Sequence, residues 1–350
     1  MISEQQSSNE FTRARALARL APYLGEADQP RAWQAARRLH DAGARARALC
    51  SLVDTLPFGD QRAAALDEAL TLARSIDQPW LRVRACVAVM MRLPPAEKAA
   101  VAAEVLEAIA MIRNEWHRGR ALMLAARSLP DEARDRAAAA AQSIGIPYVR
   151  ALALSAYCEC LSGELRVQIL RAAPLVIDDW LRASLLGEVA GYLAGEQSAE
   201  ALAEALRIPD RAARASALHG MAQALPEDVR PLLLQQALTT ARQIEDDFGR
   251  AQTLAMLLGD LTGDQRTLAL REARQAVRSI GDSALRAATL IDLLPGVAGH
   301  VQAELLQEVQ VAIAQIEDVD SRAEALSQII AYREAETRAA AARAVLDLWR

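Results

Sequence analysis

The sequence contains few of the residues on which disulfide pairing, aromatic stacking or membrane insertion depends. Aromatic residues make up 4% of its 350 residues, and Lys98 is the only lysine among 40 basic residues. The four cysteines follow no disulfide-framework spacing, and a chain of this length folds without such bridges. Charged residues interrupt every apolar run well short of the roughly 18 residues that a membrane-spanning helix needs. The sequence therefore predicts neither a disulfide scaffold nor a membrane protein.

Linkers and targeting segments are also missing. The 16 glycines and 13 prolines do not gather into a linker that would divide domains. Residues 1–10 are mostly polar and hold two acidic side chains, which predicts a polar N-terminal tail and no secretory signal, so we expect a cytoplasmic protein. The net charge of −5 disfavours nucleic acid as the partner of the chain as a whole. Charge is nevertheless uneven, because residues 1–150 carry +4 and residues 151–350 carry −9.

Catalytic and metal-binding motifs are absent from the sequence. It contains no GxxxxGK[ST], no GxGxxG after a strand, no GxSxG, no HExxH and no CxxC. Cys158 and Cys160 are two positions apart, a spacing that is weak evidence for a metal site. We therefore expect a protein that is not an enzyme, with no catalytic residues, no bound metal and no cofactor.

The sequence is rich in alanine and leucine, and both belong to an internal repeat. The repeats align on an Arg followed, in the consensus, by Ala, any residue, Ala and Leu, with the Leu present in nine of the ten repeats. An aliphatic residue lies six positions before the Arg in nine of the ten. Successive Arg anchors are 32 to 37 residues apart. The anchors are Arg13, Arg45, Arg82, Arg118, Arg150, Arg182, Arg214, Arg250, Arg286 and Arg322.

The spacing of the anchors predicts helices. Many spacings are 32 or 36 residues, and the difference of four is close to one helical turn, so a shorter helix keeps its buried face in phase. We therefore predict an all-α fold, an α-solenoid of about ten helix-turn-helix repeats forming a superhelix, with residues 11–350 as a single domain. Counting the Arg as position one, positions 1, 2, 5, 8, 9 and 12 of the first helix should face the core. Positions 3, 6, 7 and 10 should form the opposite, exposed side.

The Arg anchors are predicted to be structural. They lie on the core side, and in repeats six to ten each has an Asp four residues earlier, where an N-cap and an ion pair are expected. The long side chain could also reach carbonyls at the end of the preceding helix. These aspartates are Asp178, Asp210, Asp246, Asp282 and Asp318.

Two groups of exposed positions are candidate binding sites. The first, which we name the basic rail, consists of the arginines at position three of repeats one to four and two more on the same exposed side, and it would suit an anionic or acidic partner. An ordinary solvated surface is the alternative. The basic rail comprises Arg15, Arg19, Arg47, Arg84, Arg120 and Arg127.

The second group, named the central groove, combines glycines with a few polar side chains in repeats six to eight. A glycine inside a helix costs up to about 1 kcal/mol relative to alanine, so something could need close approach there. Tight packing between repeats is the alternative. The central groove comprises Ser184, Gly187, Glu188, Gly191, Ser216, His219, Gly220, Gln223 and Met256.

The repeat unit also resembles a known class of arrays. RAxALxxLAxxLP with a downstream LxxALxxARxI, as in residues 214–244, resembles the tetratricopeptide-like or HEAT-like repeats attached to bacterial STAND-type signalling NTPases. The resemblance covers residues 11–350 and implies a sensor or scaffold. The Trp, Gly, Tyr and Pro signature of tetratricopeptides at a 34-residue period is absent, and the chain contains no NTPase module.

These observations predict a non-enzymatic scaffold or sensor that presents the exposed side of its first helices to a protein or peptide. One alternative is a HEAT-like DNA-binding or glycosylase-type solenoid, and another is a small-molecule sensor that uses the central groove. The C-terminal apolar residues Leu346, Leu348 and Trp349 stand where a polar cap is expected, which indicates possible self-association through that end.

Overall fold

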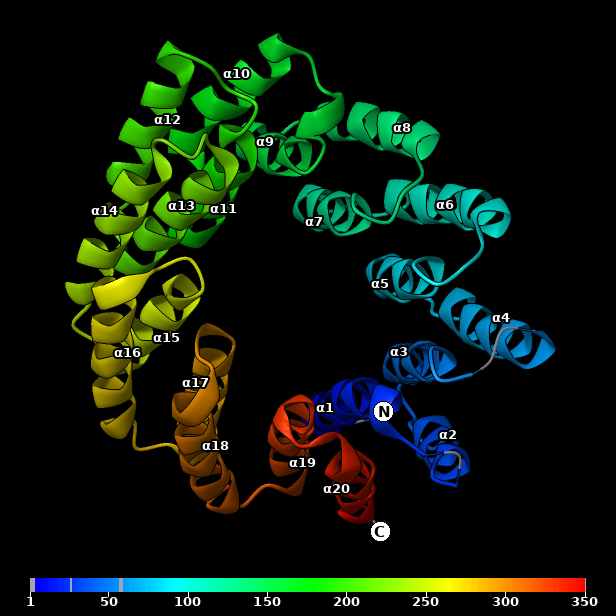
Figure 1. Cartoon of the computed structure of the whole chain (residues 1–350). Helices are drawn as coiled ribbons and strands as arrows, with labels where there is room; N and C mark the ends of the chain where they lie inside the picture. Colours follow the sequence, from blue (N-terminus) through cyan, green and yellow to red (C-terminus); the bar gives the residue numbers. More distant parts are fainter. Residues whose placement is uncertain (1–3, 26, 57–58, 350) are drawn as a thin grey trace. The chain divides into compact units, whose positions relative to one another are not determined.

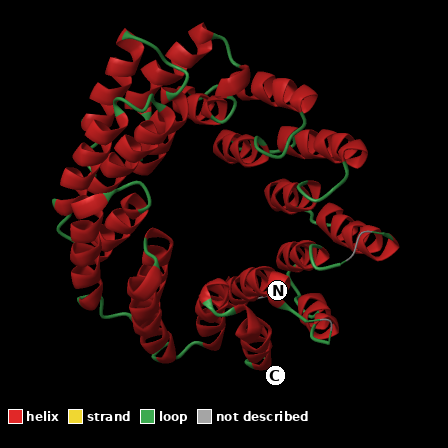
Figure 2. Cartoon of the chain, in the orientation of Figure 1, coloured by secondary structure: helices red, strands yellow, loops and turns green. Residues whose placement is uncertain are grey.

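The protein is an all-α solenoid in the computed structural model, which describes residues 4–25, 27–56 and 59–349. These residues form twenty α-helices and five short 3-10 helices, with no strand among them (Figure 2). The helices alternate as first and second helices of ten consecutive pairs, and each Arg anchor lies on a first helix. Within the described ranges, no helix is both long enough and apolar enough to cross a membrane.

The first helices carry odd numbers, and the second helices carry even numbers. The first helices are α1 (Glu4–Leu20), α3 (Ala42–Val53), α5 (Pro79–Met90), α7 (Glu115–Ala125), α9 (Pro147–Ser155), α11 (Asp179–Ala190), α13 (Arg211–Ala224), α15 (Asp247–Leu258), α17 (Ser283–Leu293) and α19 (Val319–Ile329). The second helices are α2 (Gln29–Arg37), α4 (Asp60–Arg74), α6 (Pro95–Ala110), α8 (Asp131–Gln142), α10 (Gly163–Ala172), α12 (Glu196–Leu206), α14 (Arg230–Arg242), α16 (Gly263–Arg278), α18 (Gly299–Ala314) and α20 (Ala335–Asp347). The 3-10 helices are η1 (Ala21–Tyr23), η2 (Cys158–Cys160), η3 (Ala173–Leu175), η4 (Leu294–Gly296) and η5 (Ile330–Tyr332).

The chain divides into two compact units, residues 1–111 with 304–350 (unit 1) and residues 112–303 (unit 2). In unit 1, α1 packs on α3 and α3 on α5, while α1 also packs on α19. In unit 2, α7, α9, α11, α13, α15 and α17 pack in chain order. The coloured ribbon shows these neighbours within each unit (Figure 1).

The N-terminal segment differs from the expected polar tail of residues 1–10. Helix α1 begins at Glu4, and Glu10 is buried. The Glu10 carboxylate accepts a hydrogen bond from the backbone N–H of Asp41 at 2.6 Å and lies 3.0 Å from Nδ1 of His40. These polar partners allow the carboxylate to be buried. Residues 1–3 of the tail lie outside the described residues.

Helix starts follow the predicted capping pattern. All five predicted aspartates are N-caps, and each carboxylate accepts a hydrogen bond from the backbone N–H three residues later, which satisfies a donor that the helix itself cannot use. Asp41 caps α3 in the same way, and Asn114 caps α7.

The Arg anchors terminate the preceding helices, as predicted. Six of them donate to the carbonyl of the aliphatic residue six positions earlier, just after a second helix ends, so they satisfy a backbone acceptor there. The pairs are Arg82–Ile76, Arg150–Ile144, Arg182–Val176, Arg250–Ile244, Arg286–Ile280 and Arg322–Ile316.

The ion pairs of the anchors differ from the prediction. Arg182 and Arg250 pair with Asp179 and Asp247, three residues before them, rather than with the capping aspartate four residues before. The carboxylate of the capping residue is occupied by the helix start, whereas the next residue already lies on the helix, one turn from the Arg.

Core packing agrees with the predicted register and extends it. Position two is buried in all ten repeats, as expected for the core side. Position four is also buried in all ten, a feature that the predicted register left out. Within unit 1, α3 packs against both α1 and α5, and within unit 2, α9, α11, α13 and α15 each pack against the first helices before and after them, which buries both sides of these helices. At position three, Leu152 is 2% exposed, so the exposed side is interrupted in repeat five.

The first and last repeats meet inside unit 1. The buried carboxylate of Asp320 accepts hydrogen bonds from Nε of Arg13 at 2.7 Å and from Nε1 of Trp349 at 3.0 Å. The buried carboxylate of Asp28 pairs with Arg343 at 2.9 Å. Residues more than 300 positions apart are therefore held together by carboxylates that water does not reach.

Candidate functional site

The basic rail is divided between the two units. Arg15, Arg19, Arg47 and Arg84 lie on α1, α3 and α5 of unit 1. Arg120 and Arg127 belong to unit 2, where exposed Arg127 lies 3.7 Å from Glu188 of the central groove.

At the α1 end of the basic rail, an acidic residue neutralises the arginines. Glu324 of α19 pairs with Arg15 at 2.9 Å and with Arg19 at 3.1 Å. Glu324 occupies position three of repeat ten, the same repeat position as Arg15 in repeat one. Because α1 packs on α19, the two opposite charges at this position become neighbours.

Arg47 and Arg84 are different, because no carboxylate neutralises them. Each half-buried guanidinium lies 5.7 Å from the ring centroid of Phe11, and Arg84 is also 6.0 Å from that of Trp80. Within the part of the chain that the structure describes, neither Arg47 nor Arg84 forms an ion pair. Cation–π contacts position the two charges and leave their N–H donors available.

The electrostatics of this pair favour an anion. Burial lowers the pKa of Arg47, and the neighbouring charges of Arg84 and Arg15 lower it further. A like-charge neighbour disfavours the charged form, so a bound carboxylate would relieve the repulsion between the guanidinium groups. Arginine presents a planar fork that matches a carboxylate with two parallel hydrogen bonds.

A small pocket lies beside the two guanidinium groups. Its volume is about 110 Å³, and α1, α3 and α5, together with the segment before α5, supply its walls. The lining residues are Phe11, Asp41, Ala42, Gly43, Arg47, Ile76, Leu81, Arg84 and Ala85. The carboxylate of Asp41 accepts the N–H of Ala44 at 2.7 Å, so the start of α3 already uses this acidic group.

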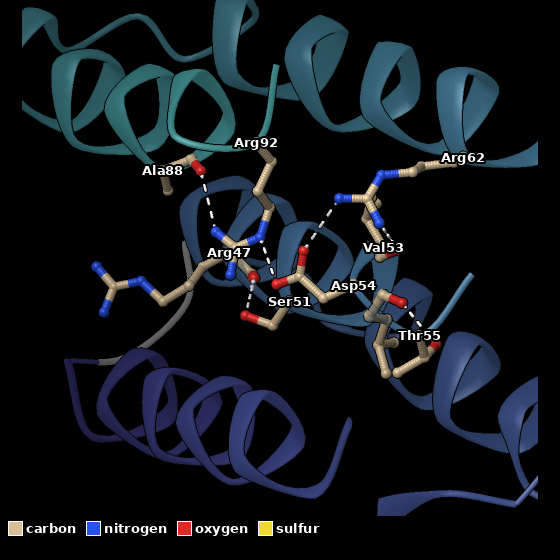
Figure 3. A network of polar contacts seen from close by, with 9 residues as sticks. Arg47, Ser51, Val53, Asp54, Thr55, Arg62, Ala88 and Arg92 are labelled. Carbon is tan, nitrogen blue, oxygen red and sulfur yellow. Dashed lines mark hydrogen bonds and ion pairs between the residues drawn. The ribbon is translucent and has the colours of Figure 1, made fainter. Parts of the chain in front are cut away.

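A polar network at the other end of α3 holds the neighbouring helices in place (Figure 3). Asp54, which follows α3, pairs with Arg92 at 2.9 Å and with Arg62 at 3.4 Å. The same arginines also donate to the carbonyls of Ala88 and Val53. This network therefore joins α3 to α4 and to the end of α5.

Arg47 takes part in that network only through its backbone. Its carbonyl accepts the hydroxyl of Ser51 at 3.0 Å, while its guanidinium points away from Asp54 and carries no dashed line in Figure 3. The helices that carry Arg47 and Arg84 are thus fixed by other residues, and the two charged groups are presented on a rigid support.

The central groove lies wholly in unit 2, and its glycines are close to other backbone atoms. A Cβ on Gly220 would lie 3.2 Å from the Cα of Gly187, and one on Gly191 would lie 3.2 Å from the carbonyl oxygen of Ala224. Helices α11 and α13 approach each other at these residues, so the absence of side chains serves helix packing. Ligand binding at the central groove stays a prediction.

The polar residues of the central groove are partly paired with one another. Nε2 of His219 lies 2.7 Å from a carboxylate oxygen of Asp260, and Gln223 donates to the same oxygen at 3.3 Å. The hydrogen bond from His219 lowers the pKa of Asp260, burial opposes that shift, and Gln223 adds to it. Of the other predicted members, Ser184 is exposed, whereas Ser216 and Met256 are half-buried.

The cysteines contribute little reactivity. Burial raises the pKa of the Cys50 and Cys158 thiols to about 12 and that of Cys86 to about 11, so these thiols stay protonated near neutral pH. Cys160 is exposed. Among the described residues, no three His, Cys, Asp or Glu side chains are arranged to hold a metal ion.

The C-terminal apolar residues are used within the chain. Leu346 is 5% exposed, Leu348 and Trp349 are half-buried, and the indole N–H of Trp349 binds Asp320. Leu346 therefore offers almost no surface to a second copy of the chain. Self-association through this end stays a prediction.

Sequence reasoning identified Arg47 and Arg84 but missed what surrounds them. Phe11 lies two residues before the Arg anchor of repeat one, yet nothing in the sequence shows that both guanidinium groups share its ring. Glu324 occupies position three of its repeat, as the arginines of the basic rail do, but carries the opposite charge. This charge could be related to the basic rail only once α19 was known to pack on α1.

No protein-family model matches the chain, and no curated protein matches it in sequence. The function is therefore argued from the geometry described above.

Proposed function

We propose that the protein is a non-enzymatic binding module that holds an acidic protein or peptide on the exposed sides of α3 and α5. The observation that carries the proposal is the pair Arg47 and Arg84, two guanidinium groups on a common aromatic ring that have no carboxylate partner among the described residues. Uncompensated charge of one sign attracts a partner of the opposite sign and fixes its register. Arg15 adds to the field at Arg47 although Glu324 pairs with it.

The kind of module follows from the repeat. The repeat resembles the tetratricopeptide-like and HEAT-like arrays of bacterial STAND-type signalling NTPases, in which such arrays act as sensors or scaffolds. A protein composed of stacked helix pairs suits that role, because consecutive first helices present a continuous surface to an extended partner.

A binding titration tests this function. The probe is a short fluorescein-labelled peptide of glutamates with one central serine, and the readout is fluorescence anisotropy. We expect the wild-type protein to bind it, and Arg47→Glu with Arg84→Glu to weaken binding about tenfold or more, since each exposed charge pair contributes up to about 1 kcal/mol. Arg136→Glu, at an exposed position of α8, is the matched control and should leave the affinity unchanged.

A second probe separates an acidic protein partner from nucleic acid. Labelled duplex DNA is titrated across a salt series from about 50 mM to about 200 mM, over which phosphate contacts give a steep loss of affinity. DNA that binds more tightly than the glutamate peptide, with a steep salt slope removed by the double variant, would overturn the proposal in favour of a nucleic-acid-binding solenoid. A peptide affinity that is the same in the wild type and in the double variant would also overturn it.

A further inference from the structure

The pocket beside Arg47 and Arg84 has the size and lining of a site for one side chain. Its volume of about 110 Å³ is below the roughly 150 Å³ of an apolar protein cavity that binds benzene. Phe11, Ile76, Leu81 and Ala85 supply apolar walls, and apolar lining rewards burial of an aliphatic group.

Gly43 keeps this pocket open. It lies in the first turn of α3, and a Cβ placed on it would lie 3.2 Å from Oδ1 of Asp41 and 3.7 Å from Cζ of Phe11. Its backbone has no positive φ, so the conformation itself does not require glycine. The missing side chain thus leaves space directly over the ring that both guanidinium groups share.

The charges next to the pocket define what accompanies the buried group. Arg47 and Arg84 line the pocket together with the apolar residues, and Asp41, the acidic group there, is occupied as the cap of α3. An apolar side chain that enters the pocket therefore brings its neighbouring residues within reach of two uncompensated cations. Acidic neighbours are stabilised there, and basic neighbours are repelled.

We infer that the pocket takes one aliphatic side chain of an acidic peptide segment, with Arg47 and Arg84 binding the carboxylates that flank it. This inference rests on the proposed function and specifies its partner as an aliphatic residue of leucine or isoleucine size between acidic residues. The pocket supplies selectivity, because the charges alone do not distinguish one acidic segment from another.

Exchanging the central residue of the probe tests the inference. The glutamate peptide is made with serine, alanine, valine, leucine or tryptophan at its centre, and each is titrated by anisotropy. We expect affinity to rise from serine to leucine by about tenfold, because burial in the pocket removes the apolar surface of the leucine side chain from water. Affinity should fall again at tryptophan, whose side chain exceeds the pocket. This series needs no change in the protein.

A variant of the pocket gives an independent readout. Gly43→Leu places a side chain in the pocket, and it should bring the leucine peptide down to the affinity of the serine peptide while the serine peptide itself is unaffected. Gly281→Leu, at a position in unit 2 where a Cβ meets no atom within 4 Å, is the matched control. Circular dichroism of each variant confirms that the helices remain.

The outcomes distinguish this inference from the proposed function on which it rests. If all central residues give one affinity and Arg47→Glu with Arg84→Glu weakens every peptide, the pocket inference is overturned and the proposed function stands. If no peptide binds, or if the arginines do not matter, both are overturned. A size optimum at leucine that Gly43→Leu removes supports the inference.

Discussion

At the scale of single residues, the same amino acid performs two unrelated tasks. The Arg anchors bind backbone carbonyls and end helices, whereas Arg47 and Arg84 lie over an aromatic ring with unused donors. Position in the repeat separates the two roles: position one faces the end of the preceding helix and position three faces outward. Sequence reasoning predicted the structural role of position one, because the period of the repeat is readable without coordinates, and it left a binding surface or an ordinary solvated surface open for position three.

An anchor should therefore matter for stability. Arg182 donates twice to the carbonyl of Val176, at 3.0 and 2.6 Å, and is mostly buried. Arg182→Met retains an apolar stem but leaves the carbonyl without its partner, which should lower the free energy of unfolding by about 1 to 2 kcal/mol in urea titrations. Arg136→Met, at an exposed surface position, should stay within about 0.5 kcal/mol. Equal effects from the two would show that the anchors are ordinary surface residues.

The pair His219 and Asp260 predicts a dependence on pH. Hydrogen bonds hold the pKa of Asp260 below its usual value in the folded state. A carboxyl group with a depressed folded-state pKa adds stability above its unfolded pKa, near 3.9, and loses it as pH falls through the folded pKa. The stability difference between wild type and Asp260→Asn should therefore be largest above about pH 5 and disappear on acidification toward about pH 2. Calorimetry across that range measures it, and a difference that grows on acidification contradicts the assignment.

At the scale of elements, glycine decides how closely two helices approach. Helices α11 and α13 are near enough at Gly187 and Gly220 that a Cβ on Gly220 would lie 3.2 Å from the Cα of Gly187, closer than most Cβ contacts. The sequence predicted that these glycines have a purpose but left two purposes open, a ligand site or tight packing. The distance between the two helices shows that these glycines take part in packing. The sequence could not show this, because a periodic pattern does not specify how closely two helices approach.

The same substitution at two glycines should give different results. Gly220→Leu places a side chain against the backbone of Gly187 and should destabilise the protein by about 1 to 3 kcal/mol. Gly259→Leu has a similar helical backbone but no atom within 4 Å, and it should be neutral or slightly stabilising, since leucine is the better helix former. Thermal unfolding midpoints provide the measurement. A tolerated Gly220→Leu would mean that the two helices are not in close contact.

At the scale of the whole molecule, the solenoid was predictable and its terminal contact was not. Ten anchors at near-constant spacing indicate a helical repeat, and the five predicted aspartate N-caps agree with the structure, whereas α1 begins at Glu4, within the predicted polar tail. The contact of α1 with α19 depends on pairs such as Arg13 and Asp320, which are 307 positions apart. No periodic pattern specifies that two such residues meet, and the basic rail looked uniform for this reason, although Glu324 neutralises one end of it.

The terminal contact should contribute to the stability of unit 1. Asp320→Asn keeps one oxygen acceptor but removes the buried negative charge that pairs with Arg13, and the loss of this ion pair and its charge-assisted hydrogen bonds should destabilise the contact by about 2 kcal/mol. Amide hydrogen exchange should speed up in α1 and α19, while exposed Glu200→Gln serves as the matched control without effect. Unchanged exchange in both helices would show that the contact is not maintained in solution.

The central claim is that Arg47 and Arg84 recognise acidic side chains by charge, and a charge exchange tests it most directly. The glutamate peptide with central leucine and its lysine counterpart are each titrated against wild type and against Arg47→Glu with Arg84→Glu. The account predicts that wild type prefers the glutamate peptide and that the double variant prefers the lysine peptide. A double variant that keeps the wild-type preference would contradict the account.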